Sequence, residues 1–406
     1  MAKDNYSRRD FIKTGSVAGL LGIAGISGIP VDLSLLATNP TAKVAIKVPR
    51  RVFGKTKVQV SVLGMGGMYD ITTNLIIAKK AYDWGINYWD TAAGYNGGNS
   101  ETGIGMFFEK FPETRKDIFL VTKSGDMNPE GMTKLLQRSL DRMKTSYIDL
   151  YFLHGIRSID PLTPAVKIWA EKMKNAGKIR YFGVSTHSNM ADLLDKAADL
   201  GWIDGIMLTY NFRFMTDDKM NKAIDKCVKA GIGLTAMKTQ GVTINSDSEA
   251  DMKLAGHFIT KGYTPFQAKL KAVWGDKRIS SICSQMPNLT VLSANVAAAV
   301  DKKALSLNDY QMLREYAKTT CDSYCAGCNH LCSFGRDSLE PIADVMRCLM
   351  YYKGYGNLEL AQSTYKSIPE SVRDVLNGAD VSVAEMCCPH QIKIGERIQE
   401  ARVLFG

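Results

Sequence analysis

Four ionisable residues in the first half of the chain have the types needed to deliver a proton during reduction of a carbonyl: Asp90, Tyr95, Lys123 and His154. Such a reaction places a hydride on carbon and a proton on the developing alkoxide. A tyrosine, with a free pKa of ~10, keeps its proton at neutral pH and can donate it. A lysine ammonium stabilises the phenolate left behind, a carboxylate holds the lysine, and a histidine hydrogen-bonds the substrate oxygen. Each residue alone also fits a purely structural role, so their placement in the fold decides between the two.

Short apolar segments predict where these residues lie. Eight strand candidates recur at roughly even spacing, separated by segments such as Met132–Met143 with apolar residues at three- and four-residue steps. The candidates are Val60–Gly66, Ile86–Ala92, Ile118–Ser124, Ile148–Gly155, Arg180–Thr186, Gly205–Asn211, Gly231–Lys238 and Ile279–Gln285. This alternation predicts a (β/α)8 barrel, whose active site forms at the C-terminal ends of the strands. Asp90, Lys123 and His154 lie at such ends and Tyr95 follows in a loop, which indicates an enzyme.

Length and composition place further structure beyond one barrel. The 406 residues exceed the ~250 typical of this fold, so about 100 C-terminal residues form something else. A hydrophobic fraction of 45% and a charged fraction of 23% are ordinary for a globular protein. The net charge of +10 comes from Lys and Arg spread along the chain, so no nucleic-acid partner is expected. We predict a signal and linker over 1–42, the barrel over 43–302 and a helical domain over 303–406.

The N-terminal segment predicts export. Arg8 and Arg9, followed by Phe11-Ile12-Lys13, precede a weakly apolar Gly/Ala-rich run that ends at Pro30. This pattern is typical of a twin-arginine signal, which implies the twin-arginine export machinery as a partner and the periplasm as the destination. The alternative is the exposed basic start of an amphipathic helix. Because the twin-arginine route carries folded proteins, it suits a chain that acquires a cofactor before export.

Several motifs resemble a known family. They are Asp90-Thr91-Ala92-Ala93-Gly94-Tyr95, Ser100-Glu101, Val121-Thr122-Lys123-Ser124, Ser139-Leu140-Asp141-Arg142-Met143, Leu153-His154 and Gly183-Val184-Ser185. In this order, from about Arg51 to Asn295, the chain resembles the aldo/keto reductases. The resemblance implies that Asp90, Tyr95, Lys123 and His154 form a catalytic tetrad. It also implies NAD(P)H-dependent reduction of a small-molecule carbonyl, or oxidation of an alcohol in reverse.

The nicotinamide site implied by the resemblance is unorthodox. Ser185 matches the family's carboxamide-binding serine, but the usual asparagine after it is Thr186. A methionine replaces the usual glutamine at 207, and another replaces the usual stacking tyrosine at 237, where its polarisable thioether can still cover a ring. An arginine that would select the 2′-phosphate is not identifiable, so the choice between NADP(H) and NAD(H) stays open. The expected cofactor-binding residues are Ser185, Met207, Met237, Lys238 and Asn295.

The cysteines form a second candidate site. Seven of the nine follow residue 320, and four of them, from Cys321 to Cys332, are separated by gaps of three, two and three residues. Disulfides are a natural expectation for an exported chain, but cysteines this close rarely bridge comfortably. Zinc and an iron–sulfur cluster both accept four cysteines. A metal centre is therefore favoured, with disulfides kept as an alternative.

The choice of metal depends on a second resemblance. Cys388-Pro389 is similar to the Cys-Pro end of ferredoxin-type motifs, and the tail resembles a C-terminal extension that some aldo/keto reductases carry. The resemblance implies a 4Fe–4S cluster, with zinc as the alternative. Cys321 is the main alternative ligand. Cys387 is expected to be only a neighbour of the ligand Cys388, and Cys348 is expected to pack in a helix. The implied ligands are Cys325, Cys328, Cys332 and Cys388.

The remaining C-terminal residues show helical periodicity. The expected helices are Ser306–Lys318, Pro341–Tyr352, Leu358–Tyr365 and Ile392–Ala401. The favoured function is carbonyl reduction by an exported barrel with a helical iron–sulfur domain. A second hypothesis discards soluble nicotinamide and passes electrons through the cluster to an electron-transfer partner. A third is a non-enzymatic barrel with a structural metal.

Overall fold

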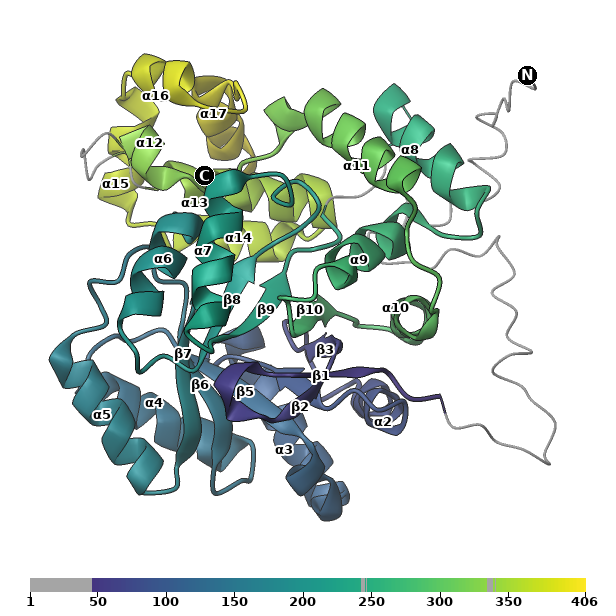
Figure 1. Ribbon diagram of the computed structural model, residues 1–406. Coiled ribbons are helices and arrows are strands. Elements are labelled where there is room, and N and C mark those ends of the chain that lie inside the picture. The colour runs from purple at the N-terminus through teal and green to yellow at the C-terminus, as the bar shows by residue number, and fades with distance from the viewer. Residues whose placement is uncertain (1–45, 242–244, 246, 334–338, 340) are drawn as a thin grey trace. The chain divides into compact units, whose positions relative to one another are not determined.

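The computed structural model describes residues 46–241, 245, 247–333, 339 and 341–406, so the predicted export signal lies outside the described residues. The chain divides into two compact units (Figure 1). The first unit comprises residues 46–240 and 267–305. The second unit comprises the described residues within 241–266 and 306–406. No helix in these ranges combines the length and apolarity that a membrane span requires.

The first unit is the predicted barrel. Eight parallel strands of the described chain close in the order β10-β3-β4-β5-β6-β7-β8-β9. Their bounds are β3 Leu63–Gly66, β4 Tyr88–Asp90, β5 Phe119–Ser124, β6 Ile148–Leu153, β7 Ile179–Thr186, β8 Gly205–Thr209, β9 Gly233–Met237 and β10 Ser281–Gln285. Each overlaps one predicted strand. Several predicted strands run too long because the apolar run continues into buried loop residues, as at Thr91 and Ala92 beyond β4.

The helices of the barrel begin at local signals in the sequence. Asn128, Thr163 and Asp217 each accept a backbone N–H with the side chain, which satisfies a donor that the first turn leaves unpaired. Proline follows two of these caps, where its missing N–H is harmless. The helices are α2 Leu75–Asp83, α3 Asn99–Lys110, α4 Pro129–Arg142, α5 Pro164–Asn175, α6 Met190–Asp199, α7 Asp218–Lys229, α9 Pro265–Gly275 and α10 Leu289–Val300.

A hairpin that was not predicted precedes the barrel, and its second strand takes up the start of the predicted strand Val60–Gly66. β1 (Arg50–Val52) pairs antiparallel with β2 (Gln59–Ser61), and Phe53 between them is fully buried. A Cβ placed on Gly233 would lie 2.4 Å from the Phe53 ring, and one on Gly205 would lie 3.0 Å from it. These glycines begin β9 and β8, so the ring fills the N-terminal end of the barrel.

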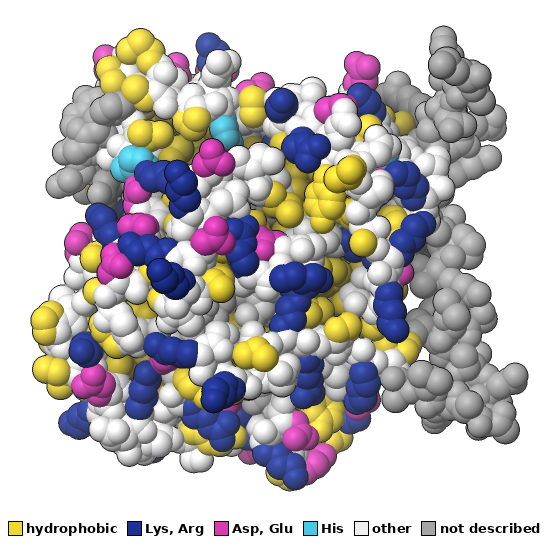
Figure 2. Space-filling model, in the orientation of Figure 1, with side chains coloured by type: hydrophobic (Ala, Val, Ile, Leu, Met, Phe, Trp, Pro, Cys, Tyr) yellow, Lys and Arg dark blue, Asp and Glu magenta, His cyan; other side chains and the backbone are white. Residues whose placement is uncertain are grey.

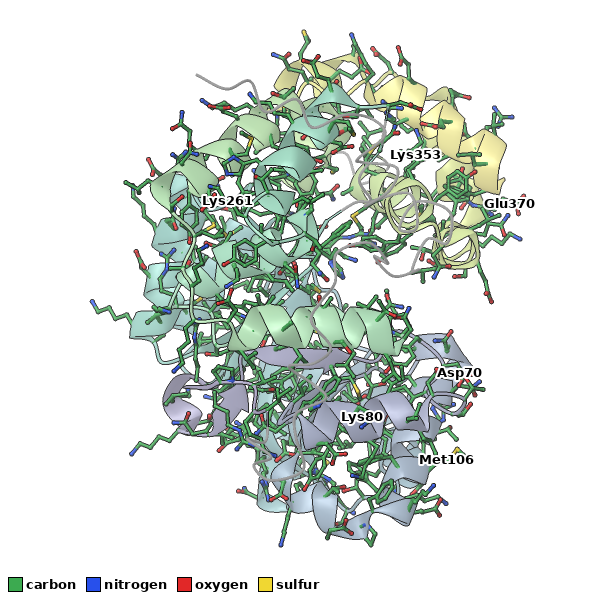
Figure 3. The ribbon with its side chains drawn as sticks, turned by 90° about the vertical axis from the view of Figure 1, so that its right-hand side faces the viewer. Asp70, Lys80, Met106, Lys261, Lys353 and Glu370 are labelled. Atoms are coloured by element: carbon green, nitrogen blue, oxygen red, sulfur yellow. The ribbon has the colours of Figure 1, made fainter. Side chains whose placement is uncertain are left out.

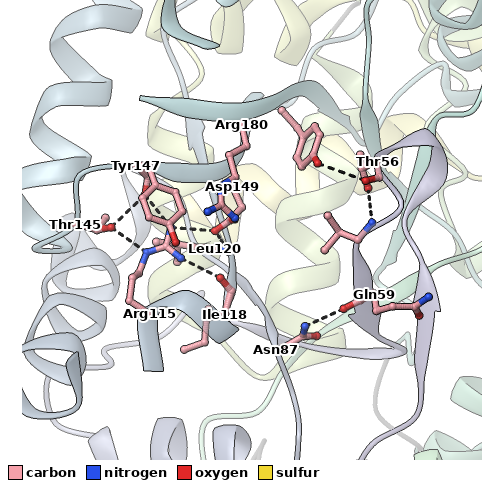
Figure 4. Close-up of polar contacts among 12 residues, drawn as sticks. Thr56, Gln59, Asn87, Arg115, Ile118, Leu120, Thr145, Tyr147, Asp149 and Arg180 are labelled. Atoms are coloured by element: carbon pink, nitrogen blue, oxygen red, sulfur yellow. Dashed lines mark hydrogen bonds and ion pairs between the residues drawn. The ribbon is translucent and has the colours of Figure 1, made fainter. Parts of the chain in front are cut away.

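A polar network joins three strands near their N-terminal ends (Figure 4). The buried Asp149 carboxylate of β6 accepts hydrogen bonds from Arg115 at 2.9 Å, Arg180 at 2.9 Å and the Leu120 N–H at 3.0 Å. Both guanidinium groups also stack on the Tyr147 ring, at 3.8 and 4.3 Å from its centroid. The two cations and the amide compensate the buried charge. This network lies at the opposite strand ends from Asp90 and His154.

The second unit is helical, as predicted. The four expected helices are present. The short α12 and α16 were not predicted, because so few residues carry little periodicity, and α8 and α15 were not predicted either. A buried cluster that includes Cys348, Tyr365 and Phe405 forms its core. The helices are α8 Glu249–Ile259, α11 Leu307–Thr319, α12 Asn329–Ser333, α13 Ile342–Leu349, α14 Leu358–Lys366, α15 Glu370–Gly378, α16 Ser382–Cys387 and α17 Ile394–Phe405.

Helix α8 belongs to the second unit although it precedes β10 in the chain. Tyr316 of α11 donates to the Asp251 carboxylate of α8 at 2.6 Å. Asp309 of α11 pairs with His257 at 2.7 Å and with Lys261, labelled in Figure 3, at 2.5 Å. Burial opposes the charge of Asp309, but hydrogen bonds from Lys261 and its neighbours hold the pKa of this carboxyl below its usual range. These contacts join two segments that lie far apart in the sequence.

The charged side chains form no single patch on the face drawn in Figure 2. Lys and Arg are scattered there among acidic and apolar side chains. The positive net charge therefore does not concentrate into one binding surface on this face.

We expect Phe53→Ala to destabilise the barrel strongly, because it leaves a cavity that the strand ends cannot close. Loss of a buried phenylalanine typically lowers the free energy of unfolding by about 3–5 kcal/mol. Denaturant unfolding followed by far-ultraviolet circular dichroism measures the loss. Phe53→Leu, which retains most of the volume, is the control, and equal losses for the two variants would contradict the filling role.

Candidate active site

The structure brings the four predicted tetrad residues to one end of the barrel. Asp90 is the last residue of β4, Lys123 is the fifth residue of β5, and His154 directly follows β6. Tyr95 begins a short 3-10 helix, η3 (Tyr95–Gly98), in the loop after β4. Because neighbouring parallel strands end at the same rim, residues from separate motifs converge there.

A buried ion pair is the centre of this site. Lys123 Nζ lies 2.6 Å from Asp90 Oδ2 and also donates to the Thr91 carbonyl at 2.8 Å. The side chains are only 1% and 3% exposed, respectively. Burial opposes the charge on Lys123, but Asp90 together with Tyr95 and Cys283 outweighs it, so the pKa of Lys123 is raised and the group stays an ammonium. Burial also raises the pKa of Asp90, against the opposing effect of Lys123.

Tyr95 and His154 lie beside this pair and are less buried. Lys123 Nζ is 3.5 Å from Tyr95 Oη and 4.9 Å from the centre of the ring. The His154 ring meets the Tyr95 ring edge-on, with 5.6 Å between centroids. An ammonium this close favours the phenolate form of a tyrosine. The arrangement can therefore deliver a proton from Tyr95 to an oxygen held near His154.

A supporting network fixes the loop that carries Tyr95. Arg142, at the end of α4, donates to the Ala93 carbonyl at 2.9 Å and pairs with the fully buried Glu101 at 3.3 Å. Thr122 donates to the other oxygen of Glu101 at 2.7 Å. Arg142 and Glu101 stood in the motifs that resemble the family, but the sequence alone assigned them no role. Their role is to position the loop.

Three of the predicted nicotinamide-binding residues lie on adjacent strands. Ser185 of β7 is in register with Met207 of β8, and Met237 ends β9. Ser185 Oγ accepts the Gly155 N–H at 2.9 Å, which leaves its own proton to donate to a carboxamide. Lys238 follows with a positive φ of 57°, an uncommon backbone conformation for a residue with a side chain. The donor at Ser185 fits the carboxamide of a nicotinamide and Met237 is partly exposed, whereas Met207 is buried in the barrel interior and presents no surface to a ring.

Asn295, the fifth predicted cofactor residue, lies in a closed polar triangle. Its side-chain amide donates to Ser284 Oγ at 3.1 Å and accepts from Gln240 Nε2 at 3.1 Å. Ser284 in turn donates to Gln240 Oε1 at 3.0 Å. No motif in the sequence marks Gln240 or Ser284 as functional. The triangle links the ends of β9 and β10 to α10.

The predicted metal ligands converge in the second unit. A small pocket, partly open to solvent, is lined by four cysteines together with the apolar side chains of Ile342, Met346 and Ile392 and by His390. The Cys325–Cys328 turn includes Gly327 at a φ of 75°, which directs the Gly327 N–H to the Cys325 sulfur. The cysteines are Cys325, Cys328, Cys332 and Cys388.

The other cysteines lie elsewhere. Cys321 and Cys387 are not among the pocket-lining residues, and Cys348 is buried in the helical core. All nine cysteines, each within the described ranges, are free thiols. Burial raises the pKa of Cys325 and of Cys332 to about 12, and the nearby thiols add to this. No three Cys, His, Asp or Glu side chains in the described part of the chain are grouped so as to hold a single metal ion.

Comparisons with known proteins agree with the barrel. A model of the aldo/keto reductase family matches residues 63–281. An L-galactose dehydrogenase of Arabidopsis thaliana is 24% identical over 300 residues, which cover 66% of this chain and 93% of the relative. An NADH-specific methylglyoxal reductase of Escherichia coli is 26% identical over 262 residues, which cover 56% and 74%.

Solved structures share the same architecture. The holo form of the aldo-keto reductase AKR11C1 from Bacillus halodurans aligns with a TM-score of 0.55 and 23% identity, covering 66% of this chain and 96% of that chain. The thermostable aldo-keto reductase Tm1743 aligns with a TM-score of 0.54 and 24% identity, covering 66% and 99%. At these identities the likeness shows the fold.

Proposed function

Because the chain belongs to the aldo/keto reductase family, whose members use NAD(P)H, we propose that it reduces a small-molecule carbonyl with a nicotinamide cofactor, or runs the reverse oxidation. The observation that carries the proposal is the Asp90–Lys123 pair, with Lys123 Nζ within reach of Tyr95 Oη. It places a phenol with an adjacent ammonium at the strand ends where a barrel enzyme acts.

Each tetrad residue has one task in this reaction. The nicotinamide, when bound against Ser185, supplies the hydride. The Tyr95 hydroxyl gives its proton to the oxygen that becomes an alkoxide, and Lys123 stabilises the phenolate until solvent returns the proton. His154 donates a hydrogen bond to the same oxygen and orients it. Asp90 keeps Lys123 charged and in place.

Tyr95→Phe tests this assignment. The variant lacks the proton donor but keeps the ring that packs against His154, so turnover should fall at least ~100-fold while nicotinamide affinity stays nearly unchanged. Oxidation of NADH and of NADPH is followed by absorbance with a panel of carbonyls that includes methylglyoxal, and affinity is followed by nicotinamide fluorescence. Near-normal turnover of the variant would contradict the role of Tyr95.

We also propose that the second unit binds a 4Fe–4S cluster. The donor set supports this, because four cysteines line one pocket with apolar walls. Three of them lie close together in the sequence, and Cys388 is remote from them. Such clusters are held by cysteine thiolates, and the surrounding apolar shell tunes their potential. The cluster would supply one-electron chemistry. A variant of the function follows, in which electrons pass through this centre to a partner protein rather than to soluble nicotinamide; the departures at Met207 and Met237 favour it.

The cluster proposal predicts a brown protein with about four irons per chain after anaerobic purification. Cys388→Ala removes a proposed ligand and should abolish or destabilise the cluster, whereas the adjacent, exposed Cys387→Ala should retain it. Iron analysis and visible absorption measure both variants. Zinc, which has a filled shell, would leave the protein colourless and refute the cluster. Loss of iron in Cys321→Ala but not in Cys388→Ala would instead overturn the ligand choice.

The twin-arginine signal supports a third proposal, that the chain is exported to the periplasm in its folded form. The proposal comes from Arg8, Arg9 and the residues that follow them. Changing both arginines to lysine should leave the precursor in the cytoplasm with its activity intact. Cell fractionation and immunoblotting measure the distribution, with a single Lys3→Arg change as the charge-conserving control. Unchanged periplasmic accumulation of the double variant would contradict this route.

A further inference from the structure

One oxygen of the central ion pair lacks a conventional partner. Asp90 Oδ2 binds Lys123, but Asp90 Oδ1 is buried and has no hydrogen bond of ordinary geometry among the described residues. A buried carboxylate oxygen without a donor is unfavourable, because it loses its water and gains nothing in return. The surroundings of Oδ1 therefore contain the group that compensates it.

Strand order places a thiol on this side of Asp90. In the order β10-β3-β4, Gly66 of β3 is in register with Asp90 on one side and with Gln285 on the other. Cys283 lies two residues before Gln285 and so faces the same side of the sheet. A Cβ on Gly66 would lie 3.1 Å from the Cys283 sulfur. Because glycine has no side chain, the thiol can reach across β3 towards Asp90.

We propose that Cys283 is a positioning residue of the tetrad, whose S–H donates to Asp90 Oδ1 and holds the carboxylate in the orientation that fixes Lys123. The inference deepens the proposed function and depends on it for its kinetic test. Cys283 packs against the interior cluster that contains Tyr88 and Met207. It does not touch the reacting atoms, and it acts only through Asp90.

The electrostatics agree with a protonated thiol as the donor. Burial and the adjacent Asp90 raise the pKa of Cys283 well above its ordinary value, so the sulfur keeps its proton. Hydrogen bonding by Cys283 works in the opposite direction on Asp90 and lowers the pKa of that carboxyl. Other titratable groups that act on the pair or on the thiol are Lys123 of β5, Tyr95 of η3, Tyr88 of β4 and Lys238 after β9.

The first test is kinetic. Cys283→Val keeps the approximate shape of the side chain but removes the hydrogen-bond donor. The pKa of Asp90 then rises, so the acidic limb of the pH profile of kcat/KM moves to higher pH. At a pH on that limb, kcat/KM should fall roughly threefold to tenfold, the range for a weak donor to a charged acceptor. Cys283→Ser retains a donor and should keep the limb of the native enzyme. Cys227→Val is the matched control, because Cys227 is another buried thiol, bonded to the Leu194 carbonyl and remote from the tetrad.

The second test needs no turnover. The infrared difference spectrum between the native protein and Cys283→Ser isolates the S–H stretching band of Cys283. Asp90→Asn should shift this band to higher frequency, because the hydrogen bond from the thiol becomes weaker. An unshifted band, or a Cys283→Val acidic limb equal to that of the native enzyme, would overturn the proposal. Cys283→Ala replaces the valine variant if the latter does not fold. Absence of nicotinamide-dependent turnover in the native protein would refute the proposed function, while the infrared band would still decide the role of Cys283.

Discussion

The Asp90–Lys123 pair imposes a strict condition on the barrel. Two opposite charges that are almost fully removed from water are stable together, but either one alone would be a severe liability in the same place. The strands must therefore deliver both residues to the same depth, and the loop after β4 must return so that Tyr95 meets the ammonium. Two further features serve the same condition. Arg142 and Glu101 hold this loop, and Gly66 leaves room for Cys283 beside Asp90. The site is thus a consequence of where one ion pair is buried.

Much of this arrangement could be predicted from the sequence, and the exceptions have physical causes. The eight strands and the long helices were predicted, because each repeats an apolar pattern over many residues. The β1–β2 hairpin was missed because its strands of three residues carry almost no pattern. Gln240, Ser284 and Cys283 were missed for another reason: their roles arise from strands that are distant in sequence and adjacent in the barrel, and nothing local distinguishes such residues from ordinary core positions.

The two units use different sources of stability. The barrel encloses a dense aromatic interior, with Phe53, Tyr88 and Phe119 in mutual contact at its N-terminal end. The helical unit has a smaller buried cluster, and four of its cysteines line a small pocket beside that cluster. A bound metal centre there would contribute folding energy that the helices alone lack. If the proposed centre is bound, its occupancy and the integrity of the unit are therefore expected to be coupled.

The origin of α8 bears on how the chain is made. Its residues leave the ribosome between β9 and β10, yet Tyr316, which donates to Asp251, and Asp309, which pairs with His257, belong to α11, which is synthesised later. During translation α8 must therefore wait for these partners while the last barrel strand is completed. A gene that ended after residue 305 would leave Asp251 and His257 without these α11 contacts. The second unit is thus not a contiguous C-terminal addition to the chain, because one of its helices lies between two barrel strands.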